Sequence, residues 1–452
     1  MPTARGAAGP DLAVEHYESA SFWLASLGAP LAPRPALEGD LRCDVAIAGA
    51  GFTGLWTAYF LKQLQPSLDI VMLDANIAGY GASGRNGGWC AAELLHLESW
   101  LEHPATRTAA IALQRELFET VQRVGTITAH EGIDCHFARE GVVTLATSPA
   151  QFARLAASSA MMARAGFGAD YVLLDRAGAA RYVAGDHVVG GLYSPHCAAI
   201  QPARLARGLA QVLERSGVRI FERTPVQEIA PRSLIARSGS VTGEACILAC
   251  EGYTPRIAGF ERALAPIHSR MIVTAPLNDT QWRASGLARR ICFGDSNRMV
   301  AYGQVTADRR IAFGARGDYH FASRIEDRID RDDPNLRAAR ERLPKLVPGA
   351  GELEITHAWT GPLGVSRARR PFVFFDAAAG FGWAGGYLGQ GVAASCLAGH
   401  RLSRAITASH ELPRDDLLVT RCRPRKFEAE PVRWLGISAY RQWLTLLDRL
   451  DR

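Results

Sequence analysis

The segment Gly49-Ala-Gly51-Phe-Thr-Gly54 has the residue types and spacing that bind the pyrophosphate of a dinucleotide. Gly49 permits a tight turn, Gly51 lets the backbone approach the pyrophosphate, and Gly54 lets a helix pack closely on a strand. The segment follows an apolar run at 44–48, and Asp74 stands 20 residues after the last glycine. A carboxylate there accepts ribose hydroxyl groups, so the pattern predicts a dinucleotide site rather than a glycine turn without a ligand. The predicted contacts of this part are Gly49, Gly51, Phe52, Thr53, Gly54, Asp74 and Ala75.

A second glycine-rich segment, residues 79–88, has five glycines in ten residues and follows soon after Asp74. A domain that binds only NAD has little need for such a loop, whereas FAD is longer and needs a segment that wraps its pyrophosphate and the flavin edge. The alternative is an ordinary flexible loop. Hydrogen-bonding side chains and the positive charge of Arg85 favour the ligand. The predicted contacts are Ser83, Gly84, Arg85, Asn86, Gly87 and Gly88.

A third cluster, residues 380–391, precedes a helix expected at 392–406. A glycine-rich approach to a helix N-terminus marks an anion site, and the helix dipole favours the negative charge that develops on a flavin ring when it is reduced. Small residues also allow close helix packing, which is the alternative. We predict that this cluster faces the flavin, through Gly385, Gly386, Tyr387, Gly389, Gln390 and Gly391.

The three clusters, in this order, resemble the glycine-oxidase/D-amino-acid-oxidase family of FAD proteins. Residues 81–88 are most similar to its γ-glutamylputrescine oxidoreductase branch. Three further positions match places where the family contacts FAD, namely Val226, Ala249 and Gly361. The likeness covers about residues 40–410. It implies oxidation of a small-molecule amine or amino-acid-like substrate by hydride transfer to flavin N5, with hydrolysis of the resulting imine and return of the electrons to oxygen or another acceptor.

Two departures from the family pattern carry information. Relatives that grip an α-carboxylate commonly place arginine where this chain has Leu363, so another arginine would have to replace it. The candidates are Arg270, Arg316, Arg367 and Arg369. Residues 85–88 contain no histidine and residues 359–361 no cysteine, the places where relatives tether the flavin, so we predict non-covalent FAD. Some relatives use a lysine near flavin N5 to promote the reaction with oxygen. None of the three lysines of this chain is expected there, so a dehydrogenase stays open beside an oxidase.

Aromatic walls exclude water from a substrate cavity and favour an unprotonated amine. Our predicted substrate and catalytic residues are Tyr302, Tyr387, Trp383 and His320, with core packing as the alternative for each aromatic ring and a surface loop for His320. The chemistry needs no catalytic triad, and no metal-ligand spacing is present.

The elements that must position these residues form an α/β protein. We expect an FAD-binding Rossmann-like domain of the glutathione-reductase type, interrupted by an inserted α+β substrate domain. The nucleotide domain is assigned to 41–100, 185–262 and 355–410, and the substrate domain to 101–184 and 263–354. Strands are predicted at 265–275, 299–305 and 309–315 in one sheet, and helical segments at 322–343. Residues 1–40 are expected to pack on the body as a leader, and Trp434 and Trp443 to pin the tail 411–452.

Bulk composition excludes several classes. The chain has 452 residues, 48% of them hydrophobic, and a net charge of +6 without a basic stripe, so nucleic acid is not an expected partner. No secretory signal or membrane span is expected, and nine cysteines without ligand spacing favour a cytoplasmic protein. Two alternative functions stay open. One is an NAD(P)-linked dehydrogenase, which leaves two glycine clusters unexplained, and the other is a non-catalytic flavin-binding subunit.

Overall fold

A computed structural model describes residues 17–28, 30–94, 97–407 and 416–451. The first sheet has the strand order β17-β18-β11-β1-β2-β8, with β9 and β10 paired beside β11. From β18 to β8 all neighbours are parallel, and β17 is antiparallel to β18. The strands are β1 (Leu41–Ala48), β2 (Ile70–Leu73), β8 (Arg219–Phe221), β9 (Val226–Ala230), β10 (Ser233–Ala236), β11 (Gly239–Leu248), β17 (Phe372–Asp376) and β18 (Phe381–Gly385).

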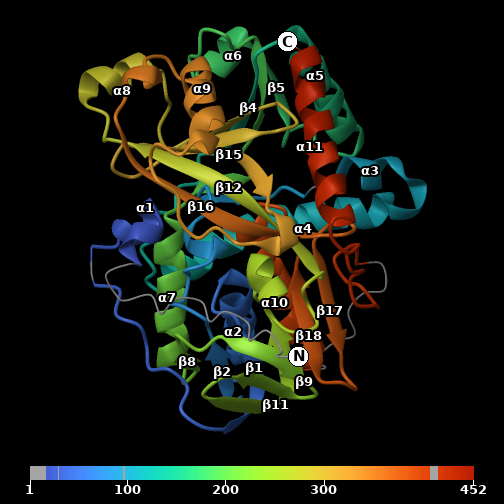
Figure 1. Cartoon of the computed structure of the whole chain (residues 1–452). Helices are drawn as coiled ribbons and strands as arrows, with labels where there is room; N and C mark the ends of the chain where they lie inside the picture. Colours follow the sequence, from blue (N-terminus) through green and yellow to red (C-terminus); the bar gives the residue numbers. More distant parts are fainter. Residues whose placement is uncertain (1–16, 29, 95–96, 408–415, 452) are drawn as a thin grey trace.

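The central strands of this sheet are covered on both faces, which is why they read as continuous apolar runs. Residues 45–48 and 70–73 are buried. Helices α2 (Phe52–Leu64) and α10 (Gly391–Ile406) share one core with β1 and β2, and α7 (Pro202–Arg215) joins the same core. In Figure 1 these helices and the first sheet form the lower half of the molecule.

The second sheet has the order β16-β12-β15-β14-β13-β4-β6-β5 and lies in the upper half of Figure 1. Its strands are β4 (Val142–Ala146), β5 (Val172–Asp175), β6 (Gly190–Ser194), β12 (Leu264–Thr274), β13 (Cys292–Asp295), β14 (Ala301–Val305), β15 (Ile311–Tyr319) and β16 (Ile355–Ser366). The helices around it are α5 (Pro149–Arg164), α6 (Arg176–Ala180), α8 (Asp279–Ser285) and α9 (Arg337–Leu346). Helix α4 (Pro104–His130) runs between the halves, preceded by α3 (Leu97–Glu102). A small ribbon pairs β3 (Trp89–Ala91) with β7 (Cys197–Ala199).

The α/β architecture predicted from the sequence is confirmed, and the strands expected at 265–275, 299–305 and 309–315 are neighbours in one sheet. The α-helix in the range 322–343 is restricted to its end, where a 3-10 turn at Pro334–Leu336 leads into α9, and the start of the range has only a 3-10 turn at Phe321–Ser323. Strands β6 and β16 both belong to the second sheet, although the sequence grouped 185–262 and 355–410 with the nucleotide domain. Residue patterning alone does not reveal which sheet a strand joins.

The described part of the leader packs on the second glycine cluster. Helix α1 (Phe22–Ala25) is buried, Ser21 Oγ donates to Gly84 O at 2.7 Å, and Trp23 Nε1 donates to Asn86 O at 2.7 Å. Residues 1–16 and 29 of the expected leader lie outside the described residues. The leader therefore holds a predicted ligand-binding loop from behind.

The tail forms helix α11 (Val432–Leu450), but Trp443 is not its anchor. Trp443 is 53% exposed, so the prediction that it pins the tail is wrong, whereas Trp434 is 38% exposed and meets the ring of Phe321 on the body. The helix attaches through polar groups, with the buried side chains of Arg433 and Asp448 near its ends. These attachments use charged side chains, which are buried because they are paired. Sequence reading looks for apolar residues as anchors and so could not find them.

Candidate functional site

A cavity of about 2530 Å³ runs from the carboxyl edge of the first sheet to the face of the second sheet. Typical small-molecule pockets enclose about 300–1,000 Å³, so this one has room for a long dinucleotide and a second molecule beside it. The three glycine clusters, far apart in sequence, converge on it. The predicted residues in its lining are Gly49, Gly51, Phe52, Thr53, Asp74, Ala75, Ser83, Asn86, Gly87, Val226, Ala249, Tyr302, Tyr387, Gly389, Gln390 and Gly391.

The first cluster connects β1 to α2. Gly49 has φ +106°, the left-handed region that glycine enters without strain, and Gly51 is the N-cap of α2 with no side chain to cap it. A Cβ on Gly54 would lie 2.0 Å from Gly49 O, so only glycine lets the helix approach this turn. The helix N-terminus is therefore directed at the cavity with a bare backbone, which is the arrangement that binds phosphate.

Asp74, at the end of β2, ties the turn together. Its Oδ2 accepts the N–H of Ala50 and its Oδ1 accepts the N–H of Asn76, each at 2.8 Å. Burial raises the pKa of Asp74 to about 6, against the two N–H bonds, which lower it. The carboxylate lines the cavity with lone pairs to spare for hydroxyl donors.

The second cluster is folded by its own polar side chains. Ser83 Oγ accepts the N–H of Phe52 at 2.8 Å, which joins this loop to the first cluster. Asn86 Nδ2 donates to Ala82 O and Ser83 O at 3.0 Å, and its Oδ1 accepts the N–H of Gly88 at 2.7 Å. Asn86 thus shapes the loop, which leaves its backbone and Ser83 to face the cavity.

Arg85 is not among the residues that line the cavity, although we predicted that its charge would serve the pyrophosphate. Its guanidinium is buried, 4.0 Å from the centre of the Tyr80 ring, and pairs with Asp327 at 3.3 Å. Trp359 Nε1 donates to Arg85 O at 2.8 Å, and a Cβ on Gly361 would lie 3.0 Å from Arg85 Cβ. Arg85 and Gly361 support the loop from behind. The other predicted FAD contacts outside the lining are Gly54, Gly84, Gly88, Gly385 and Gly386.

The third cluster is held by a buried carboxyl that sequence reading did not single out. Glu251 Oε2 accepts the N–H of Gly386 at 3.2 Å, and Oε1 accepts the N–H of Tyr387 at 3.1 Å. Burial raises the pKa of Glu251 to about 7. The Tyr387 hydroxyl lies 3.1 Å from Thr53 Oγ1 and so joins the third cluster to the first. The signal that could have found Glu251 is its acidic side chain at the end of an apolar strand.

Two of the predicted substrate-cavity residues line the cavity and two do not. Tyr302 in β14 lines it, packs edge-on against Trp89 and shares a hydrogen bond with Ser269, while burial raises its pKa. Trp383 is buried in β18 against Phe372, with ring centres 4.7 Å apart. His320 lines a separate surface hollow. The structure does not bring Trp383 or His320 to the site, and neither enters the proposals below.

Glu93 and Trp89, which lie beyond the second cluster, line the cavity and were missed. Glu93 Oε2 accepts Gln390 Nε2 at 3.0 Å, and burial raises the pKa of the carboxyl. Arg316 of β15, one of four arginines considered from the sequence, also lines the cavity. Both acidic and basic groups therefore meet the space beside the third cluster.

Two observations indicate that the residues lining the cavity fit a bound dinucleotide. A Cβ on Gly51 would meet only Ser83, with Oγ at 3.0 Å, so this backbone is open on its cavity side. The buried Oε1 of Gln390 has no hydrogen-bond partner among the described residues, and a ligand N–H would satisfy it. In the part of the chain that the structure describes, no three His, Cys, Asp or Glu side chains gather where a metal ion could bind.

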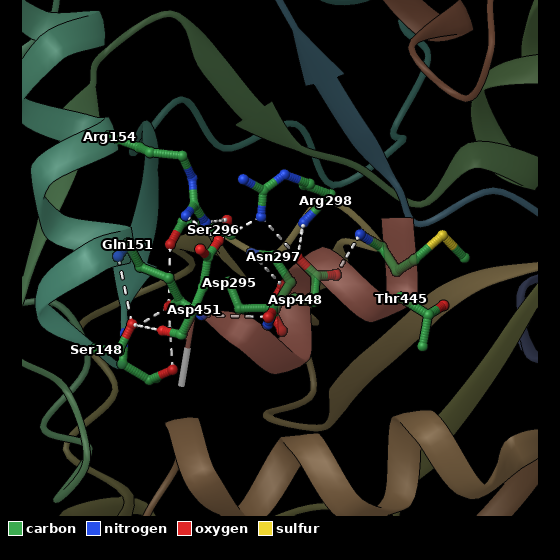
Figure 2. Close-up of polar contacts among 12 residues, drawn as sticks. Ser148, Gln151, Arg154, Asp295, Ser296, Asn297, Arg298, Thr445, Asp448 and Asp451 are labelled. Atoms are coloured by element: carbon green, nitrogen blue, oxygen red, sulfur yellow. Dashed lines mark hydrogen bonds and ion pairs between the residues drawn. The ribbon is translucent and has the colours of Figure 1, made fainter. Parts of the chain in front are cut away.

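One wall of the cavity, the loop 295–299, is held by the C-terminal helix. Figure 2 shows Asp448 of α11 and Asp451, the residue just after the helix, directed at this loop. Asp448 accepts the backbone N–H groups of Arg298 at 2.8 Å and Met299 at 2.9 Å, and Asp451 pairs with Arg298 and Arg154. Because residues 295–298 line the cavity, α11 positions part of the site.

Comparison with known proteins gives a family match over residues 44–405, to the family described as FAD dependent oxidoreductase (DAO). Gamma-glutamylputrescine oxidoreductase of Escherichia coli strain K12 is 28% identical over 402 residues, which cover 87% of this chain and 90% of that protein. The probable oxidoreductase OrdL of Rhizobium meliloti strain 1021 is 27% identical over 375 residues, 79% of this chain and 81% of that protein.

Solved structures share the fold. Glycine oxidase from Bacillus cereus ATCC 14579 superposes with a TM-score of 0.67 at 18% identity, over 85% of this chain and all of that one. Iminodiacetate oxidase from Chelativorans sp. BNC1 gives 0.63 at 19% identity, over 83% and 99% of the two chains. Within the described residues, no helix combines the length and the apolar character needed to cross a bilayer.

Proposed function

The chain belongs to the FAD-dependent oxidoreductase (DAO) family, and from this premise we propose that it oxidises a C–N bond of a small amine or amino-acid-like substrate. Its cofactor is FAD. The names of its relatives, γ-glutamylputrescine oxidoreductase among them, support the class of substrate. The observation that carries the proposal is the convergence of the three glycine clusters on one cavity, where the Tyr387 hydroxyl meets Thr53.

The residues proposed to hold FAD are those of the lining described above. Asp74 and Val226 would bind the adenosine end, and the backbone at Gly51 with Ser83 would bind the pyrophosphate. The segment 387–391 would hold the flavin edge, with Glu251 fixing two of its N–H groups. We propose non-covalent attachment because the chain has no histidine in 85–88 and no cysteine in 359–361, where relatives tether the flavin.

When bound, FAD would supply the acceptor for a hydride from the carbon next to the substrate nitrogen. The protein's part is to bind, orient and keep water out. The rings of Tyr302, Trp89 and Tyr387 line the cavity and give it apolar walls, which favour the neutral form of an amine. The imine product then reacts with water to give a carbonyl compound and a free amine or ammonia.

The electron acceptor and the compartment belong to the proposal. Some relatives use a lysine near the flavin to promote its reaction with oxygen, and no described lysine lines this cavity. Oxygen and a second redox protein therefore both stay open as acceptors. All nine cysteines are unpaired, which supports a reducing compartment such as the cytoplasm.

Purified protein tests the proposal directly. We expect a yellow protein with an absorbance band near ~450 nm, the mark of an oxidised flavin. Acid precipitation should release the flavin into the supernatant if it is not covalently bound. Without air, an amine substrate should bleach the band, and readmitted oxygen should restore it only if the enzyme is an oxidase. A colourless protein that binds NAD would overturn the proposal, and a yellow protein that no amine bleaches would leave a flavin-binding protein without amine oxidation.

A further inference from the structure

The C-terminal helix α11 exposes a continuous apolar stripe, and Figure 1 shows this helix along the outer side of the upper half of the molecule. Consecutive members of the stripe are three or four residues apart, which places them on one face of a helix. Ala439 is its small exposed member. The large members are each 52–73% exposed, and they are Val432, Leu435, Trp443, Leu446 and Leu450.

The opposite face of α11 is polar and binds the body. Arg433 is buried, and its guanidinium donates to Glu261 O at 3.1 Å. Arg441 pairs with Asp318, and Asp448 holds the loop 295–299. A surface helix normally turns its apolar side to the core, so this arrangement is the reverse of the usual one. Because polar contacts fix the helix on the body, the fold presents the apolar stripe outward.

The stripe has the area of an interaction surface. From their exposed fractions, its five large side chains expose on the order of 500 Å², and patches of about 300–600 Å² on a monomer are often functional. Two such stripes packed together would remove roughly 1,000 Å² from water, and with their polar edges they approach the about 1,200–2,000 Å² of a stable interface. The ring of Trp443, near the middle of the stripe, is of the type that dominates interface energies.

The spacing of the stripe is nearly the same from either end of the helix. Counted from position 441, its members lie nine and nine, six and five, and two and two residues away on the two sides. A two-fold interface needs a surface that is complementary to itself, and this spacing provides one for two antiparallel helices. The large ring of Trp443 would then meet the small Ala439. The pairs related by the two-fold axis are Val432 with Leu450, Leu435 with Leu446, and Ala439 with Trp443.

The distribution of charge favours a second copy of the chain over a lipid surface. No charged residue interrupts the stripe, so two copies with a net charge of +6 each can meet there without opposing like charges. A helix that binds a membrane surface carries Lys or Arg beside its apolar face. Of the three arginines of α11, only Arg449 is exposed, whereas Arg433 and Arg441 are engaged with the body.

We propose that the protein is a homodimer in which the stripes of two α11 helices pack antiparallel about a two-fold axis near position 441. Trp443 of each copy covers Ala439 of the other. This goes beyond the proposed amine oxidation and does not depend on it. The family match ends at residue 405, so the interface belongs to the part of this chain that follows the matched region.

Sedimentation equilibrium of the holoenzyme measures the dimer directly. We expect twice the mass of one chain as the protein concentration rises, and Trp443→Glu should weaken the association by roughly 30-fold or more, as for other residues at the centre of an interface. Thr445→Glu is the matched control, because it adds the same charge at an exposed position of α11 that lies off the stripe, and it should associate as the wild type does. A wild type that stays monomeric at every concentration would overturn the proposal, as would equal association of Trp443→Glu and the wild type.

Two charged variants test the antiparallel pairing. Leu435→Glu and Leu446→Lys should each be monomeric alone, and an equal mixture of them should dimerise, because the new acid of one copy meets the new base of the other. Both side chains are exposed in the monomer, so each variant should keep the flavin spectrum of the wild type. A mixture that stays monomeric would refute the antiparallel arrangement.

Ala439→Trp separates a second copy from a lipid surface. In the dimer, two large rings would compete for the space beside Ala439, so the variant should be monomeric. On a membrane, an added tryptophan would strengthen binding, since this residue is favoured at the interface between lipid and water. A monomeric wild type that sediments with vesicles of anionic phospholipid, and does so more strongly as Ala439→Trp, would assign the stripe to lipid and overturn the dimer.

Discussion

Replacing Gly51 by alanine should weaken FAD binding with little loss of stability in the flavin-free protein. Gly51 has φ −85° and ψ −176°, a conformation that alanine also adopts, and the new methyl group would meet only Ser83 Oγ at 3.0 Å. The loss of a good N-cap residue and this close contact together cost about 1 kcal/mol. On the cavity side the methyl group stands where the pyrophosphate must approach. Losing one charge-assisted hydrogen bond there, worth about 1.5–3 kcal/mol, weakens FAD roughly 10- to 100-fold.

Gly54→Ala is the contrasting variant, because its obstacle lies within the protein. The new Cβ would lie 2.0 Å from Gly49 O, where ordinary contacts begin at 3.4 Å, so α2 would have to retreat by roughly 1.4 Å. Overpacking of this kind costs about 1–3 kcal/mol or more, with or without FAD. Gly436→Ala is the control outside the site, since nothing lies within 4 Å of its added Cβ on the exposed face of α11, where alanine is more favourable than glycine by about 0.5–1 kcal/mol.

Two measurements on each variant separate these effects. Urea unfolding of the flavin-free protein reports stability, and titration of that protein with FAD reports affinity. We expect Gly51→Ala to lose affinity with only about 1 kcal/mol of stability, Gly54→Ala to lose more stability, and Gly436→Ala to keep the affinity of the wild type with slightly higher stability.

The result that would refute the reasoning is Gly51→Ala binding FAD with the affinity of the wild type. The backbone at residue 51 would then not meet the pyrophosphate, and the first cluster would have no direct part in the site. Equal destabilisation of Gly51→Ala and Gly54→Ala in the flavin-free state would show instead that the two glycines serve only folding.

Three more predictions concern groups that position the site. Burial raises the pKa of Glu251 from 4.5 to about 7, so its contribution to stability is present below pH ~4.5 and is lost as the pH rises to about 7. The free energy of unfolding, measured with urea on the flavin-free protein, should therefore fall from pH 5 to pH 8 by up to about 3 kcal/mol more in the wild type than in Glu251→Gln. An equal pH dependence of the two proteins would contradict this. Asp448→Ala removes the acceptor of two backbone N–H groups in loop 295–299, so the substrate KM should rise several-fold while FAD stays bound. Thr445→Ala, whose hydroxyl donates only within α11, is its control, and an unchanged KM in Asp448→Ala would refute the role of the helix. Asp74→Ala should weaken FAD binding by roughly tenfold or more, because the ribose acceptor and the bond to the Ala50 N–H are both lost; FAD titration at wild-type affinity would exclude the ribose contact.

The sequence by itself determined the local parts of the site. The turn from β1 to α2 and the acid at the end of β2 belong to one β–turn–α–β unit, where chain spacing largely dictates geometry. The glycines could be assigned for the same reason, since the close approach of Gly54 to Gly49 is a contact between residues five positions apart. Apolar runs and periodicity likewise predicted most strands and long helices.

Only the tertiary structure decided which distant groups face one another. Tyr387 meets Thr53 across 334 positions of sequence, and the buried guanidinium of Arg85 pairs with Asp327. Trp383, in a segment that reads like the rest of the third cluster, lies in the core because β18 alternates its faces. The cavity positions of Glu93 and Arg316 have no signature in the chain, since a charge that lines a cavity and one on the surface look alike until the sheets are assembled.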